Sequence, residues 1–270
     1  MPLQYVARAH PDTGPPTVLG MTPEQALLTA GAGLVAGAVN AAAGGGTLIS
    51  FPALLAAGLS PVAANITSAV GLLAGYVGGS VAYRRELAEQ RDRVRALAVP
   101  AVVGGVLGAL LLLVTPDATF QALAPVLVLT SCALLALQPW LAGVVQRSPA
   151  SGTSVPLATR LGVGVAAVYG SYFGAGLGVL LLALLGIALA DGLQRLNALK
   201  GLLSLLVNLV GVAVFVLSGQ VAWLFALVLA VSAYAGATLG VGIARRLPAA
   251  VLRGAVIAFG TAVGLALLLT

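Results

Sequence analysis

The stretch that decides the fold is GLVAGAVNAAAGGGTLISFPALLAAGLSPVAANITS, residues 33–68, because it returns as VGVAAVYGSYFGAGLGVLLLALLGIALADGLQRLNA, residues 163–198. Each copy holds an apolar run, a glycine cluster, a second, shorter apolar run, a turn and a polar pair. An offset of 130 residues relates Gly44 to Gly174 and Thr67 to Asn197. An apolar segment that glycine interrupts in both halves of a chain is typical of a transporter binding site at the middle of the membrane.

The composition indicates an integral membrane protein. Hydrophobic residues make up 60% and charged residues 7% of the 270 residues, and the mean hydropathy is +1.09. So few charges cannot cover a surface that faces water. The arginines lie in short loops between apolar spans, so we interpret them as topology signals and expect no binding of nucleic acid. The single cysteine, Cys132, excludes an internal disulfide, and residues 1–20 lack the apolar core of a signal peptide.

The apolar runs predict an all-α, polytopic membrane protein. They lie at about 23–43, 47–57, 61–83, 96–114, 118–137, 157–173, 179–190, 193–217, 221–244 and 249–269. Most approach the ~20 residues that a membrane-spanning helix needs. The runs 47–57 and 179–190 are shorter, so they either cross a thinned region or return as half-helices of a re-entrant hairpin. We expect an N-terminal tail (1–22), a first transmembrane repeat (23–138), a linker (139–156) and a second transmembrane repeat (157–270).

The loop charges predict that the two repeats are inverted. Arginines crowd residues 84–95, the linker, the turn at Arg195 and residues 245–253, whereas the turns at 58–61, 115–117 and 218–220 have none. By the positive-inside rule the first set is cytoplasmic and the second external. Loop 84–95 corresponds to turn 218–220, and turn 115–117 to loop 245–253, so the charge bias reverses between the halves. An inverted arrangement needs an odd number of crossings per half, which gives about five segments each and both termini outside.

The glycines fall into two groups. Four-residue spacing predicts close packing of helix backbones, and it occurs at Gly33/Gly37, Gly71/Gly75/Gly79, Gly104/Gly108 and Gly236/Gly240. The clusters at 44–46 and 174–178 instead predict broken helices, because adjacent glycines weaken a helix. Unwound backbone at membrane depth persists only where protein buries it or water lines it, and a half-helix that starts there favours an anion. A simple kink is the alternative.

One cation lies within a predicted span. Lys200 is the only lysine, and every acidic residue falls in a loop, a tail or a span end. Its partner is therefore a bound anion, a helix C-terminal carbonyl, or water reached by snorkelling. Asparagine, threonine and serine side chains at comparable depth add neutral donors, or simply bind helix to helix.

No span contains histidine or a deep carboxylate, so we expect no catalytic residues, no metal site and no cofactor.

Four motifs resemble the TauE/SafE family of membrane transporters. They are AGGGTLISFP (43–52), AANITS (63–68), GAGLG (174–178) and RLNALK (195–200), and the resemblance extends over nearly all of residues 31–270. It implies a transporter that exports sulfite, an organosulfonate or another sulfur-containing anion.

We therefore interpret the chain as a multi-pass transporter of the plasma (inner) membrane that moves a small anion by alternating access. The alternatives are an anion channel and uptake of a different small anion. The expected partners are the anionic substrate and the lipid bilayer, and a homodimer is left open. The expected substrate-binding residues are Asn40, Gly44, Gly45, Gly46, Thr47, Asn65, Thr67, Ser68, Tyr172, Gly174, Gly176, Gly178, Asn197 and Lys200.

Overall fold

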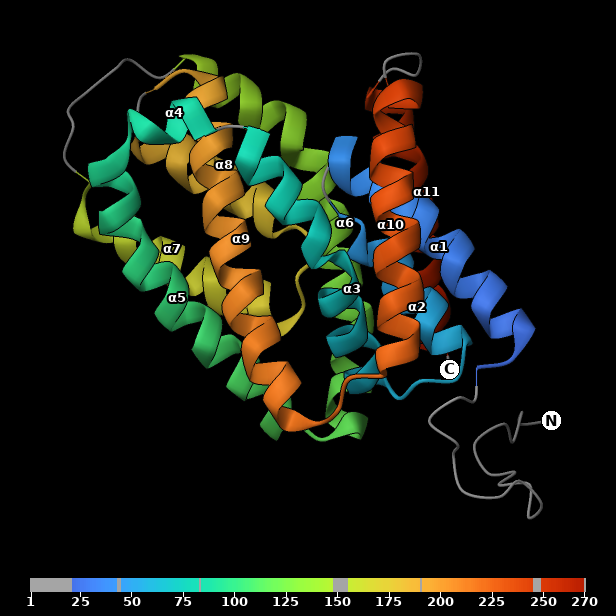
Figure 1. Ribbon diagram of the computed structural model, residues 1–270. Helices are drawn as coiled ribbons and strands as arrows, with labels where there is room; N and C mark the ends of the chain where they lie inside the picture. The colour runs from blue at the N-terminus through green and yellow to red at the C-terminus, as the bar shows by residue number, and fades with distance from the viewer. Residues whose placement is uncertain are drawn as a thin grey trace.

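The protein is all-helical over the residues that the computed structural model describes, which are 21–42, 45–82, 84–147, 155–189, 191–244 and 249–269. Within these ranges the chain forms eleven helices and no strand (Figure 1), which confirms the predicted all-α fold. The helices are α1 (Pro23–Ala42), α2 (Thr47–Ala56), α3 (Pro61–Ala82), α4 (Arg84–Ala88), α5 (Arg91–Val114), α6 (Asp117–Arg147), α7 (Leu157–Tyr172), α8 (Leu177–Ala188), α9 (Leu193–Ser218), α10 (Trp223–Ala244) and α11 (Ala249–Leu269).

Helix α6 is longer than the sequence predicts. It passes through Pro139 and continues to Arg147, so the first part of the expected linker is helical. A proline removes one backbone hydrogen bond without ending a membrane helix when neighbouring groups satisfy the freed carbonyl.

The two glycine-broken segments fold as antiparallel hairpins. In the first, the Nε2 of Gln25 at the start of α1 donates to the backbone oxygen of Ala57 just after α2, at 2.8 Å. In the second, Gly170 of α7 faces Leu177 and Gly162 faces Leu184, so α8 returns along α7. Helices of ten and twelve residues are about 15 and 18 Å long, well short of the ~30 Å hydrocarbon core. The short helices therefore double back, which is the hairpin alternative.

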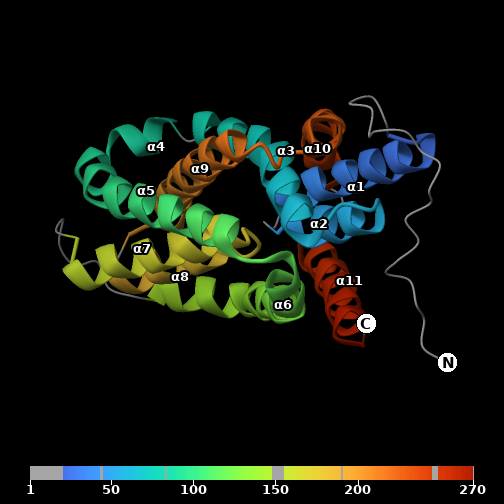
Figure 2. The same ribbon diagram turned by 90° about the horizontal axis from the view of Figure 1, so that it is seen from below.

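The helices gather into two groups, each of which combines both halves of the sequence. Helix α10 packs against α1 and α3, and α5 packs against α7 and α9. Figure 2 accordingly shows α5, α7, α8 and α9 on one side of the bundle, and α1, α2, α10 and α11 on the other. The two groups meet where α3, which packs on α10, contacts α9, which packs on α5, and where α6 contacts α11.

Glycines permit the closest of these contacts. A Cβ placed on Gly236 of α10 would collide with the backbone oxygen of Leu34 in α1, and a Cβ on Gly104 of α5 would collide with that of Gly164 in α7. The packing role predicted from four-residue spacing is thus confirmed at Gly33, Gly37, Gly71, Gly104, Gly108 and Gly236. Gly75 has only the side chain of Asn40 within reach, and the surroundings of Gly79 and Gly240 lie outside the described part of the chain.

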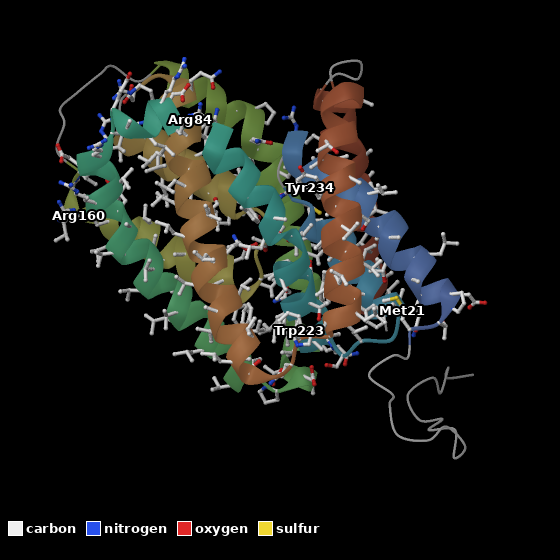
Figure 3. All side chains as sticks on the ribbon, viewed as in Figure 1. Met21, Arg84, Arg160, Trp223 and Tyr234 are labelled. Carbon is white, nitrogen blue, oxygen red and sulfur yellow. The ribbon has the colours of Figure 1, made fainter. Side chains whose placement is uncertain are left out.

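Among the arginines predicted to be cytoplasmic, those of residues 84–95 and Arg195 lie at one end of the bundle, whereas Arg245 and Arg246 lie outside the described residues. The side-chain amide of Gln90, between α4 and α5, donates to the backbone oxygen of Arg195 near the start of α9. At the other end, Val62 of α3 donates to the carboxylate of Asp117, and Ala222 before α10 donates to the hydroxyl of Thr67. Figure 3 shows Arg84 and Trp223 at these opposite ends. We call the first the arginine-rich end; it holds Arg84, Arg85, Arg91, Arg93, Arg95 and Arg195.

The surface and the interior have the polarity that a bilayer requires. Apolar side chains such as Leu157, Val165 and Val231 are exposed over 64–72% of their area, whereas Thr47, Ser50 and Asn65 are buried. Among the described residues, three helical stretches are long and apolar enough to cross a membrane: Arg91–Val114, Asp117–Leu141 and Gln194–Ser218.

The glycine packing yields a pair of substitutions with opposite signs. Gly236→Ala should destabilise the protein by roughly 1–3 kcal/mol, because the new methyl group overlaps the backbone of α1. Gly254→Ala in α11 should instead stabilise it slightly, because nothing lies within 4 Å of that position and alanine favours helix. Thermal unfolding of the purified variants in detergent measures both effects. Equal stability of the two variants would contradict the close approach of α1 and α10.

Candidate functional site

The two helix breaks meet in the middle of the bundle. Gly45 in the first break, and Gly174 and Gly176 in the second, adopt positive φ angles of 99°, 87° and 83°. These left-handed conformations favour glycine and stop the preceding helix. A Cβ on Gly174 would lie 3.7 Å from the hydroxyl of Thr47, the first residue of α2. The breaks predicted from the glycine clusters are therefore confirmed, and segments far apart in the sequence are neighbours here.

A pocket opens where the breaks meet, among α2, α3, α7 and α9. The cavity has a volume of about 10 Å³, room for about one water molecule, and the empty space around it, including the part that is open to the outside, is about 360 Å³. The residues that line it are Thr47, Asn65, Ala69, Leu72, Tyr76, Gly170, Ser171, Phe173, Gly174, Asn208, Gly211 and Phe215. No charged side chain is among these described lining residues, so the pocket offers neutral hydrogen-bonding groups against an aromatic wall.

Two polar atoms of residues that line the pocket have no partner among the described residues. The Nδ2 of Asn65 donates to the backbone oxygen of Tyr172 at 2.8 Å, which leaves its Oδ1 without a donor from the described residues. The hydroxyl of Ser171 likewise has none. Both side chains are deeply buried, with exposed fractions of 3% and 7%. Buried polar atoms almost always have partners, so these two mark a place for a polar ligand or water.

A tyrosine that the sequence did not single out connects the polar groups. The Tyr76 side chain is hydrogen-bonded to those of Asn40 and Asn208, and the Nδ2 of Asn208 donates to the backbone oxygen of Ser204 at 2.8 Å. The pocket therefore brings together three predicted residues, Thr47, Asn65 and Gly174, with Asn40 adjoining them through Tyr76. Ser171 was missed as well; the only sequence signal for either residue is a hydroxyl inside an apolar span.

Other predicted residues hold the helices together around the pocket. Ser68 shares a 2.6 Å hydrogen bond with Ser50 of α2, and Thr67 accepts from the backbone of Ala222 at 3.2 Å. The ring of Tyr172 packs on Phe120 with centroids 5.6 Å apart, while its backbone oxygen holds Asn65.

The remaining predicted glycines face protein. A Cβ on Gly45 would meet Leu48 and Leu135, one on Gly46 would overlap the backbone oxygen of Ala36, and one on Gly176 would approach Leu134. Gly44 lies outside the described residues.

Lys200 and Asn197 do not line the pocket. The side chain of Lys200 lies beside Gly178, where a Cβ would be 3.8 Å from its Cδ. Lys200 is two turns before Asn208 on α9, a distance of about 12 Å along the helix. It forms no ion pair with any described residue.

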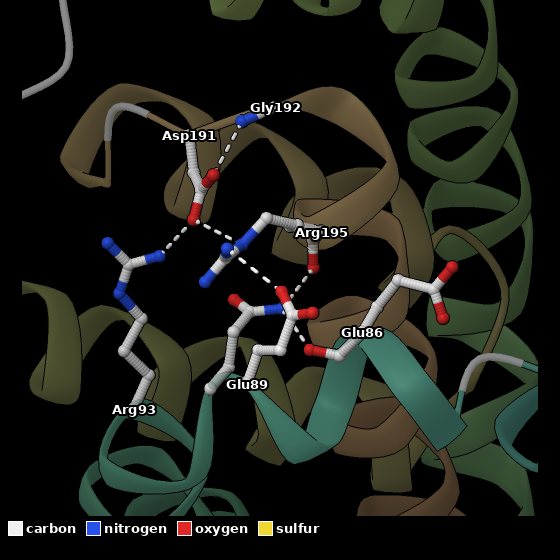
Figure 4. Close-up of polar contacts among 7 residues, drawn as sticks. Glu86, Glu89, Arg93, Asp191, Gly192 and Arg195 are labelled. Atoms are coloured by element: carbon white, nitrogen blue, oxygen red, sulfur yellow. Dashed lines mark hydrogen bonds and ion pairs between the residues drawn. The ribbon is translucent and has the colours of Figure 1, made fainter.

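A cluster of charges at the arginine-rich end joins the start of α5 to the start of α9 (Figure 4). Asp191, in the loop before α9, pairs with Arg93 of α5 and lies 3.1 Å from Nε of Arg195. Arg195 also reaches Glu89 at 3.2 Å. Partial burial raises the pKa of Asp191, but the hydrogen bonds from Gly192 and Arg93 and the charges of Arg195 and Arg93 outweigh it, so the net pKa lies below its ordinary value.

The charge cluster predicts a pH-dependent effect on stability. Because folding lowers the pKa of Asp191, its carboxylate stabilises the protein above the unfolded pKa of about 3.9, and this contribution disappears as the pH falls through the folded value. Asp191→Asn should therefore lower the stability at neutral pH by about 1.5–3 kcal/mol, and the difference from wild type should shrink below about pH 4. Thermal unfolding across pH measures it, with Asp92→Asn, an exposed aspartate, as the control. A difference that is constant with pH would exclude this role.

Comparisons with known proteins identify the family of the chain. Residues 29–267 match the family model described as "Sulfite exporter TauE/SafE". The "Probable membrane transporter protein YfcA" of Escherichia coli (strain K12) is 27% identical over 208 residues, which cover 77% of this chain and 76% of that protein. A "Probable membrane transporter protein" of Haemophilus influenzae is also 27% identical, over 77% of this chain and 80% of its own length. No solved structure matches. The chain therefore belongs to the TauE/SafE family of membrane transporters.

Proposed function

We propose that the protein exports a small sulfur-containing anion, a sulfur oxyanion or an organosulfonate, across the plasma (inner) membrane by alternating access. The observation that carries the proposal is the uncharged polar pocket at the meeting point of the two breaks. The description of the family as a sulfite exporter supports the substrate class, and the relatives named as probable transporters support the transport activity.

Two inverted repeats, residues 23–138 and 157–270, provide the moving parts in this proposal, with 1–22 as a tail and 139–156 as a linker. Several contacts support the inversion. Helix α3 begins at the end opposite the arginine-rich end, beside Asp117, whereas α9 begins at the arginine-rich end, beside Gln90. Exchanging the halves also turns the α1–α10 contact into the α7–α5 contact, and the Gly236–Leu34 approach into the Gly104–Gly164 approach.

Anion binding would rest on partial charges and neutral donors. Helix α2 begins at Thr47, in the pocket wall, so the positive end of its dipole faces the pocket. Thr47, Tyr76 and Ser171 add hydroxyl groups. The bound anion has no fixed counter-ion in this arrangement. Its binding is therefore weaker than in an ion pair, which favours its release.

We propose that Lys200 acts on the route to the pocket, because it does not line the pocket itself. Lys200, Ser204 and Asn208 recur at four-residue spacing along α9, so they share one face of the helix between the arginine-rich end and the pocket. We assign Lys200 the role of drawing the anion from the cytoplasm. An anion that leaves a cell with a negative interior gains about 2.3 kcal/mol per charge per 100 mV, so export needs no further energy source.

The inverted arrangement predicts labelling from opposite sides of the membrane. Single cysteines placed by Arg91→Cys and Gln220→Cys, both exposed positions, in a Cys132→Ser background should react with an impermeant maleimide from the inside and the outside, respectively. Oriented membrane vesicles with intact and permeabilised controls measure this. Reaction of both cysteines from one side would rule out inverted halves.

The pocket predicts a transport defect that is separate from backbone strain. Gly174→Leu should abolish flux of radiolabelled sulfite into proteoliposomes, because the new side chain starts 3.7 Å from Thr47 Oγ1 and grows into the pocket. Gly219→Leu is the matched control. It imposes the same left-handed strain of about 1–2 kcal/mol where nothing lies within 4 Å. Equal flux in the two variants, normalised to inserted protein, would place the transport site elsewhere.

A further inference from the structure

We propose that the pocket recognises its sulfur oxyanion through a hydrogen that the ligand itself carries, an O–H or N–H that donates to Oδ1 of Asn65. The inference rests on the proposed function and narrows its substrate class. The preferred ligand would offer acceptor oxygens together with at least one donor, as hydrogensulfite, a hydroxyalkanesulfonate or an aminoalkanesulfonate does.

The orientation of Asn65 carries the argument. Its Nδ2 donates to the backbone oxygen of Tyr172 at 2.8 Å. Turning the amide over would point Oδ1 at that oxygen and set two acceptors against each other, so the observed orientation is fixed. The fixed Oδ1 is buried and has no donor among the described residues, and Asn65 is one of the residues that line the pocket.

An acceptor that is fixed in this way discriminates against bare oxyanions. A carbonyl oxygen cannot donate, so every oxygen of an unprotonated sulfonate or sulfate would be repelled by Oδ1 or leave it unpaired. A ligand with a donor satisfies Oδ1 and keeps its oxygens for the hydroxyl groups of the pocket. Sites built to bond a hydrogen of the substrate reject analogues that lack it, because the buried group of the protein then stays unpaired.

Ser171 completes the pair of unpartnered atoms. Its hydroxyl can donate to a ligand oxygen, and Gly211 leaves room for it, since a Cβ at that position would come within 2.5 Å of Oγ. Asn65 would then bind the donor of the ligand, while Ser171 binds an acceptor oxygen. Two such contacts fix the orientation of a small ion that has no charged partner in the described wall of the pocket.

A series of three sulfonates of similar size tests the proposal. Ethanesulfonate carries only acceptors, 2-hydroxyethanesulfonate adds an O–H, and 2-aminoethanesulfonate (taurine) adds an N–H. Isothermal titration calorimetry on the purified protein should show both donor-bearing ligands binding roughly tenfold to hundredfold more tightly than ethanesulfonate, the ratio expected for one buried unpaired acceptor. Sulfite, part of which is protonated at neutral pH, is compared with sulfate to separate an inorganic from an organic source.

Variants assign the preference to Asn65. Asn65→Leu should reduce the ratio between the hydroxylated and plain sulfonates to near one. Thr29→Val should leave it unchanged; it removes another buried oxygen that has no partner among the described residues but lies outside the pocket lining. Ser171→Ala should weaken the binding of all three sulfonates by a similar factor and preserve the ratios of their affinities. This second variant keeps the proposal testable if Asn65→Leu fails to fold.

The outcomes are distinct. If the wild-type protein binds ethanesulfonate as tightly as its hydroxylated analogue, Oδ1 serves only an ordered water and the inference is overturned, while the proposed function stands. A preference that survives in Asn65→Leu also overturns it. If no sulfonate, sulfite or sulfate binds, the proposed function fails and the inference fails with it.

Discussion

The fold depends on one constraint: a peptide backbone that leaves its helix at membrane depth has to be covered by protein. The backbone leaves its helix at both breaks, at Gly45 and at Gly174–Gly176. Residues next to each break cover part of the other. Phe51 of α2 stacks edge-on against Phe173 in the second break, with centroids 5.5 Å apart, and Asn65 of α3 bonds the last residue of α7. The pocket exists because these contacts close around the breaks without filling the space between them.

The hairpins require surrounding helices whose backbones pack closely against each other. Glycine permits this close packing because it has no side chain. Without a hydrophobic force between helices in lipid, association depends on contact between surfaces of matching shape. The backbones of α1 and α10 touch at Gly236, and those of α5 and α7 at Gly104. The long helices α3 and α9 then contact each other where the two groups meet, and they present Tyr76 and Asn208 to the pocket. Local glycine spacing thus leads, through helix packing, to the position of the polar groups.

Sequence reasoning predicted the fold more fully than the site. Local sequence patterns predict the repeat, the breaks and the glycine contacts. The structure confirms the breaks and most of the contacts. Thr47, Asn65 and Gly174 reach the pocket because they adjoin the breaks. Tyr76 and Ser171 were missed because a single hydroxyl in an apolar span is a weak signal, and the packing of the helices decides whether it faces the pocket. Lys200 was placed by depth alone, yet the direction of its side chain takes it toward Gly178.

The exchange of α5 and α10 between the helix groups has a consequence for biosynthesis. Helix α1 is made long before its main partner α10, because eight helices lie between them in the chain order of the described residues. While the ribosome adds the intervening residues, the small-residue face of α1 has only lipid or a chaperone against it. Only α6 is synthesised between α5 and its partner α7, so α5 lacks this partner for a much shorter time. The group that contains α5 is therefore able to assemble before the group that contains α1, which closes only once α10 has been made, so α1 spends longer in the nascent chain without its main partner than α5 does.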